Sequence, residues 1–152
     1  MKFRSQKYAA CQLISAINAR IFLGGKDISN ELFEWLVNLV CARYGGALGV
    51  EKAYPYLGLG CHNGPVAPLD LNWIKKNLPV ELGIYSTKWG RHSVLVYKVN
   101  GDILHVTNNW RHNSLYWPTY TSESASGPSW KSHAEKCMPY AHQRTSRSFF
   151  KA

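Results

Sequence analysis

The hydrophobic periodicity of the chain changes near residue 80, and this change restricts the fold more than any other feature. Before it, apolar residues recur at intervals of three and four, as on one face of a helix. After it come short segments rich in branched and aromatic residues, as in strands. The sequence therefore predicts an α+β fold, in which an N-terminal helical layer packs on a small antiparallel β-sheet. With 152 residues, 45% of them apolar, we expect a single domain spanning residues 1–152.

Three helices are predicted in the first half. The first covers Tyr8 to Phe22 and ends at Gly24-Gly25, with its apolar face formed by Leu13, Ile14, Ile17 and Ile21. The second runs from about Asn30 to Arg43, with Ser29 as its cap and Gly45-Gly46 after it. Residues 45–68 hold six of the twelve glycines and three prolines, which favours an irregular connection. A short third helix is expected over residues 69–77, before Pro79.

Strands are predicted over residues 80–86, 93–99 and 103–107. Asn100-Gly101 separates the last two and is a strong hairpin signal, because both residues tolerate positive φ. Residues 119–132 are polar and predicted to form a loop. The last segment, residues 140–152, contains Arg144, Arg147 and Lys151 and no acidic residue, so we expect a basic tail or a final short element.

Eighteen Lys and Arg against nine Asp and Glu give a formal charge of +9, which favours anionic partners such as nucleic acid, cell-wall polymer or acidic protein. The basic residues are scattered, which favours general attraction over a dedicated nucleic-acid site. No apolar run is long enough to span a membrane, and the N-terminus lacks the apolar stretch of a signal peptide. We therefore expect synthesis in the cytoplasm, with any export by another route.

The four cysteines are irregularly spaced, without a C-x-x-C pair, so free thiols are expected rather than a disulfide scaffold or a four-cysteine zinc site. A zinc site could be drawn from Cys61, His62, His133 and Cys137, but neither pair has a common finger spacing. We predict no metal and no organic cofactor.

One cysteine has the surroundings of a nucleophile. Cys11 lies in the first turn of the first predicted helix, where unpaired N–H groups and the helix dipole lower a thiol pKa. His92 opens a predicted strand, and Asn108 closes its hairpin partner, so antiparallel pairing brings the two together. Asn108 could then orient the imidazole without adding a second anion. Gln6 precedes Cys11 by five residues, and its amide could join the Cys11 N–H in an oxyanion hole.

Other residues compete for these roles. His105 and His112 are alternatives for the base, and Asn109 and Asp102 for the amide. His105 sits in mid-strand, His112 follows Trp110, Asp102 lies at the turn end of the hairpin, and Asn109 would point to the opposite face from Asn108. The remaining tryptophans at 73, 89, 117 and 130 are expected in the core or lining a groove.

The combination resembles the papain-like cysteine proteases. In that family the catalytic histidine begins a strand, Asn-Ser-Trp follows about sixteen residues later, and the tryptophan shields the asparagine–histidine hydrogen bond. Here His92 is followed at sixteen residues by Asn108-Asn109-Trp110, and Gln6 and Cys11 are similar to the oxyanion glutamine and the nucleophile. Departures from papain are the flanking Ala10 and Gln12 and a Gln6–Cys11 spacing that is one residue shorter. The short chain looks more like compact bacterial and phage members, including the bacteriocin-leader peptidases.

The resemblance implies a papain-like fold with the Cys11 helix packed on the sheet. It also implies hydrolysis of a peptide or isopeptide bond in a protein or peptide substrate, through a thioester on Cys11. Two alternatives remain. One is a CHAP-like peptidoglycan amidase or endopeptidase, which shares the cysteine helix and histidine strand. The other is a catalytically silent binding module of the same fold.

Overall fold

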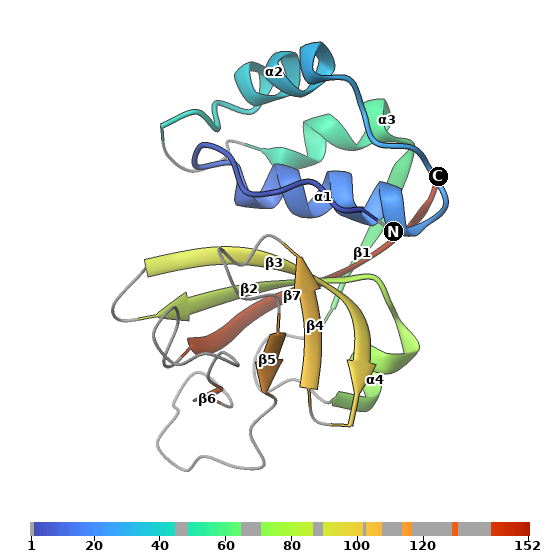
Figure 1. The fold of residues 1–152 in the computed structure, drawn as a ribbon, viewed down its shortest axis with the longest axis vertical. Helices are drawn as coiled ribbons and strands as arrows, with labels where there is room; N and C mark the ends of the chain where they lie inside the picture. The colour runs from blue at the N-terminus through green and yellow to red at the C-terminus, as the bar shows by residue number, and fades with distance from the viewer. Residues whose placement is uncertain are drawn as a thin grey trace.

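The computed structural model describes residues 2–44, 49–64, 71–86, 90–101, 103–107, 114–116, 129–130 and 141–152. The helical elements are α1 (Cys11–Phe22), α2 (Asn30–Leu39), the 3-10 turn η1 (Val50–Ala53), α3 (Tyr54–Leu57) and α4 (Leu71–Lys76). The strands are β1 (Leu59–Asn63), β2 (Val80–Ser86), β3 (Gly90–Asn100), β4 (Ile103–Thr107), β5 (Ser114–Tyr116), β6 (Ser129–Trp130) and β7 (Ala141–Lys151). A layer formed by α1, α2 and α3 lies on one side of an antiparallel sheet (Figure 1). The predicted α+β class is thus confirmed.

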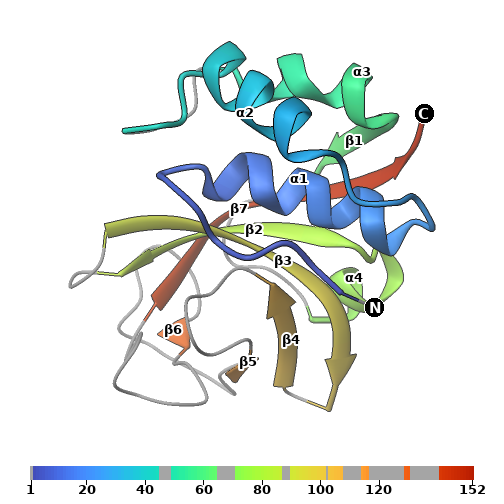
Figure 2. The same ribbon diagram turned by 45° about the horizontal axis from the view of Figure 1, so that its top comes forward.

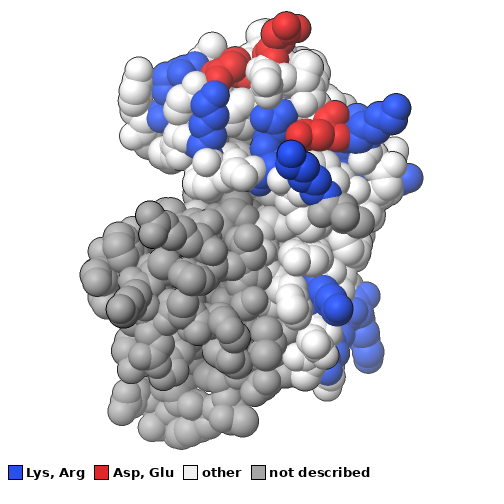
Figure 3. All heavy atoms as spheres, in the orientation of Figure 1, with Lys and Arg blue, Asp and Glu red and all other residues white. Residues whose placement is uncertain are grey.

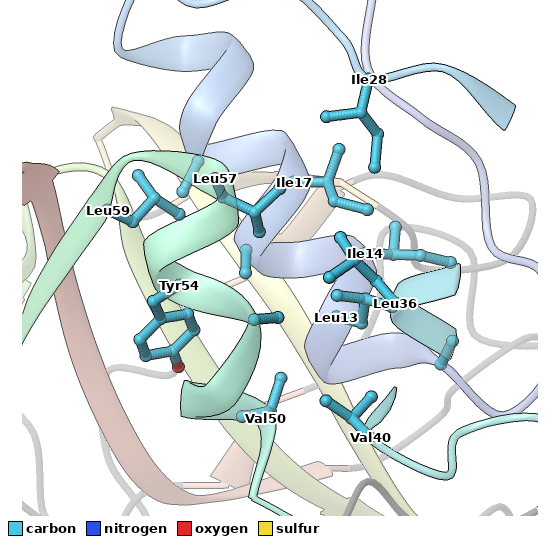
Figure 4. Close-up of a cluster of buried hydrophobic side chains, with 14 of the residues drawn as sticks. Leu13, Ile14, Ile17, Ile28, Leu36, Val40, Val50, Tyr54, Leu57 and Leu59 are labelled. Carbon is cyan, nitrogen blue, oxygen red and sulfur yellow. The ribbon is translucent and has the colours of Figure 1, made fainter. Parts of the chain in front are cut away.

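Helix α1 is the centre of the molecule. It lies between the sheet and the other two helices of its layer (Figure 2), and every residue from Leu13 to Ala19 is buried. A helix that is buried on all sides needs apolar partners on more than one face. Those toward α2 and α3 are shown in Figure 4, where Ile14 and Ile17 lie close to Leu36 and Leu57. The predicted position of Cys11, in the first turn of this helix, is confirmed.

Helix α2 begins where the sequence predicts, because the Ser29 hydroxyl accepts a hydrogen bond of 3.1 Å from the Leu32 N–H. Its predicted end at Arg43 is wrong, since the helix stops at Leu39. The Ala42 N–H bonds the Val37 carbonyl and the Cys41 N–H bonds the Asn38 carbonyl. With Cys41 at φ 54°, this is a Schellman motif built on a residue other than glycine.

The prediction of an irregular connection over residues 45–68 is wrong where the structure describes it. Residues 50–63 form η1, α3 and β1. Gly58, at φ 67°, ends α3 and turns the chain directly into β1. Strand β1 pairs with the end of the chain, Leu59 opposite Lys151, and such a distant partner leaves no signal in local composition.

Within the described residues alone, the sheet is larger than predicted, with seven strands in the order β1-β7-β2-β3-β4-β5 and β6 paired with β7. The hairpin is confirmed: β3 and β4 pair from Asn100 opposite Ile103, and Gly101 adopts φ 64°. The expectation for the last segment is wrong. It is neither a tail nor a short element, because β7 has eleven residues and joins β1 to β2 inside the sheet.

The two faces of the sheet pack against different partners. Leu95 and Phe149 join the core beneath the helical layer. The opposite face carries a second core, formed by Val80, Leu82, Val94, Val96, Leu104 and Val106 with Ile74 of α4. Strand alternation therefore assigns each residue of β2 and β3 to one of two environments. Among the helices of the described residues, none is long and apolar enough to cross a membrane.

Candidate active site

Cys11 occupies the junction between the helical layer and the sheet. It is the first residue of α1 and is half-buried, and its N-cap residue, Ala10, has no side chain that could bond the first turn. Backbone N–H groups at a helix start lack partners within the helix. Here the N–H groups of Cys11 and Gln12 both act on the Cys11 sulfur.

The predicted lowering of the Cys11 pKa is wrong for the net effect. Burial is the largest influence and raises the pKa of the thiol. The backbone N–H of Ser93 lowers this pKa, the buried carboxyl of Glu81 raises it, and the two N–H groups of the first turn lower it further. The helix start therefore acts in the predicted direction, but burial outweighs it. The thiol needs a proton acceptor before it can act as a nucleophile.

Three side chains on one face of α1 fix the helix against β3 and β4. The Cys11 sulfur accepts a hydrogen bond from the Ser93 backbone N–H. One turn on, Ser15 Oγ lies 3.0 Å from Ser93 Oγ, and about one turn further the Asn18 amide donates a 3.0 Å bond to Thr107 Oγ1. Ser15 and Asn18 are fully buried. The contacts place the N-terminal end of α1 at the beginning of β3.

His92 directly precedes Ser93 and is only 7% exposed. It is the third residue of β3 and pairs with Ile84 of β2. Because the Ser93 side chain faces α1, alternation assigns His92 to the face of Val94 and Val96. The Cys11 sulfur thus contacts the backbone N–H of the peptide that links His92 and Ser93. The His92 imidazole, however, extends from the opposite face of the sheet.

A buried polar chain extends from Ser93 across the sheet. Ser93 Oγ donates a 2.5 Å hydrogen bond to Glu81 Oε2. Glu81 Oε1 lies 3.8 Å from Arg147 Nη1, and Arg147 in turn donates to the Tyr54 hydroxyl. Burial raises the pKa of Glu81, while Arg147 and the Ser93 hydroxyl lower it. Burial likewise raises the pKa of Tyr54.

The sequence analysis did not identify Glu81 or Arg147 as site residues. A signal was present for Glu81, since an acid between the apolar Val80 and Leu82 of a predicted strand must be paired if it is buried. Arg147 could not be found because its strand was not recognised. Both residues face α1, as the register of Glu81 opposite Arg147 and Leu95 requires.

Gln6 lies in the segment before α1, outside any helix or strand, and this segment is held by several contacts. Its side-chain amide donates a 3.1 Å bond to the Tyr8 carbonyl. Tyr8 adopts φ 57°, its hydroxyl bonds Glu34 of α2 at 2.7 Å, and the Arg43 guanidinium lies over its ring. The segment is therefore held on α2. The oxyanion role of Gln6 stays a prediction.

Asn108 follows Thr107, the last residue of β4, and lies outside the described residues, as do Asn109, Trp110, His112 and Asp102. His105 is described. Helix α1 and strand β3 run in the same direction here: Ser15 contacts Ser93, and Asn18 contacts Thr107, which lies opposite Leu95. His105 pairs with Lys98, farther along the same direction. It therefore lies farther from Cys11 than the start of β3 does.

The described cysteines, Cys11, Cys41 and Cys61, are free thiols, as expected, whereas Cys137 and His133 lie outside the described residues. No group of three or more potential metal ligands occurs among the residues that were placed. Over the helical layer, acidic side chains lie beside basic ones (Figure 3), as in the ion pairs Lys7–Glu34 and Arg43–Glu34. An anionic partner stays a prediction.

No protein-family model matches the chain, and no curated protein matches its sequence.

Proposed function

We propose that the chain is a cysteine hydrolase of the papain-like type, which cleaves a peptide or isopeptide bond. Cys11 is the nucleophile, His92 the base, Asn108 the residue that orients the imidazole, and Gln6 an oxyanion donor. The observation that carries the proposal is the placement of the Cys11 sulfur at the start of a buried helix, against the backbone of the residue next to His92. A cysteine with a purely structural role would not need a histidine next to the residue that contacts its sulfur.

In the proposed reaction, His92 takes the proton of Cys11, and the sulfur forms a bond to the substrate carbonyl carbon. The negative charge develops on the carbonyl oxygen, where the Cys11 N–H and the Gln6 amide stabilise it. The imidazolium then gives its proton to the leaving amine as the carbon–nitrogen bond breaks. Water, deprotonated by His92, hydrolyses the thioester and restores the thiol.

Because the pKa of Cys11 is raised, His92 must accept the thiol proton in the proposed mechanism. A buried thiol is mostly protonated at neutral pH, so the thiolate forms only when a neighbouring base accepts its proton. An imidazole is the kind of side chain that can accept a proton near neutrality. Because alternation directs the His92 Cβ away from α1, the proposal requires the backbone at the start of β3 to turn so that the imidazole reaches the sulfur.

Hydrolysis of a peptide library by the Cys11→Ala variant tests the proposal. We expect a loss of about a thousandfold or more, with an unchanged circular dichroism spectrum. Cys41→Ala, which removes an exposed thiol from the end of α2, is the matched control and should retain full activity. Equal loss in both variants would contradict the assignment. Asn108→Ala is expected to be milder, because the amide neither gives nor takes the reacting proton.

Assays on the same variants distinguish the peptidase from the two alternatives, a peptidoglycan hydrolase and a silent binding module. Clearing of cell-wall material in a gel, without hydrolysis of peptides, would identify a peptidoglycan hydrolase that uses the same cysteine. Absence of both activities, together with absence of Cys11 labelling by a thiol electrophile at neutral pH, would identify a silent binding module.

A further inference from the structure

We propose that Glu81 is a positioning residue for Cys11: it fixes the β3 segment that contacts the sulfur, and its negative charge opposes formation of the thiolate. The inference rests on the proposed function only in taking Cys11 as the nucleophile. Neither part of it depends on the substrate.

The positioning part follows from three contacts in series. Glu81 Oε2 accepts the 2.5 Å hydrogen bond of Ser93 Oγ. A hydroxyl has one hydrogen, so Ser15 must be the donor in its 3.0 Å contact with Ser93. Ser93 is thus held by β2 on one side and by α1 on the other, and its backbone N–H is the group that meets the Cys11 sulfur. The Glu81 side chain therefore fixes a direct contact of the nucleophile.

The electrostatic part follows from burial. Glu81 is 6% exposed, and charges that are shielded from water interact strongly. Its carboxylate raises the pKa of Cys11, as a like charge must. Burial raises the pKa of Glu81 itself, but Arg147 and Ser93 oppose this.

Titratable groups reach the region of Glu81 from several of the elements around it. Within the described part of the chain they are Cys11 of α1, Arg147 of β7, Tyr54 of α3 and Cys61 of β1. Arg147 lowers the pKa of Cys61, where its effect is second to burial, and it bonds Tyr54. Among the described residues, Glu81 is the charged side chain that shifts the Cys11 pKa.

The test is the pH dependence of Cys11 alkylation by iodoacetamide, followed on the full chain by mass spectrometry of peptides so that each thiol is resolved. Glu81→Gln keeps an oxygen for the Ser93 hydroxyl and removes the charge. We expect the alkylation midpoint of Cys11 to fall by about one pH unit. Glu31→Gln, on the exposed first turn of α2, is the matched control and should leave the midpoint unchanged. An unchanged or higher midpoint in Glu81→Gln would overturn the inference.

A second variant covers the case in which Arg147, left unpaired, prevents folding. Glu81→Gln with Arg147→Met removes both charges, a change that buried ion pairs often tolerate. The Cys11 midpoint is expected to fall in this variant too, and an unchanged midpoint would overturn the inference. A shifted midpoint in a protein that cleaves no peptide or cell-wall substrate would contradict only the proposed function. Cys11-dependent hydrolysis with an unshifted midpoint would contradict only the role of Glu81.

Discussion

Ser15 of α1 and Ser93 of β3 share a buried hydrogen bond of 3.0 Å between their hydroxyl oxygens, one helical turn from Cys11. It is part of the polar seam that joins the helical layer to the sheet, together with the bond from Asn18 to Thr107. Apolar packing alone would let a helix slide or rotate on a sheet. Paired polar groups in a core fix one arrangement, because any other leaves them unsatisfied.

Ser15→Ala should therefore destabilise the fold by about 1 kcal/mol, the usual net contribution of a buried hydrogen bond. Urea denaturation measures the change, with Ser5→Ala as control because Ser5 is exposed. The control should stay within about 0.5 kcal/mol of the wild type. An equal, small effect in both variants would mean that the seam contributes nothing to stability.

The Schellman motif at the end of α2 offers a stabilising substitution. Cys41 holds φ 54°, a conformation that costs a residue with a Cβ about 1 kcal/mol. Cys41→Gly should raise the free energy of unfolding by about 0.5 to 1 kcal/mol, as measured by urea denaturation. Cys41→Ala removes the same thiol but keeps the Cβ, so it should bring no gain. A gain in the alanine variant as large as in the glycine variant would refute the backbone explanation.

Stability should also depend on pH through Glu81. Burial raises its pKa in the folded state above the unfolded value of about 4.3, so the folded protein binds more protons between these two values. Its contribution is thus fully present below the unfolded pKa and is lost as the pH rises through the folded pKa. The stability of the wild type relative to Glu81→Gln should therefore decline from pH 4 to pH 7 in urea denaturation. A difference that is constant or grows with pH would contradict the assigned shift.

The sequence was sufficient to predict the elements whose signals are local. The apolar face of Leu13, Ile14 and Ile17 predicted α1, and the Ser29 cap predicted the start of α2. The Asn100-Gly101 pair predicted the hairpin. The position of Cys11 followed from the same local pattern. The class and layer order then followed from the change of period.

Features that depend on distant partners were not predictable in this way. Strands β1 and β7 pair with each other, Gly60 opposite Phe150, and neither has a period strong enough to be recognised alone. The site was incomplete for the same reason, because Arg147 reaches Glu81 only through this sheet topology. The sign of the Cys11 pKa shift was also missed, since burial depends on the packed layers and not on the helix start.

The central claim is that His92 activates Cys11, and the rate of Cys11 alkylation at pH 6 tests it most directly. A buried thiol with a raised pKa would, without a partner, carry very little thiolate at this pH. We predict that iodoacetamide labels Cys11 before Cys41 and Cys61, and that His92→Ala slows this labelling about tenfold or more, whereas His105→Ala does not. Labelling of Cys41 or Cys61 first, or an equal Cys11 rate in wild type and His92→Ala, would contradict the account.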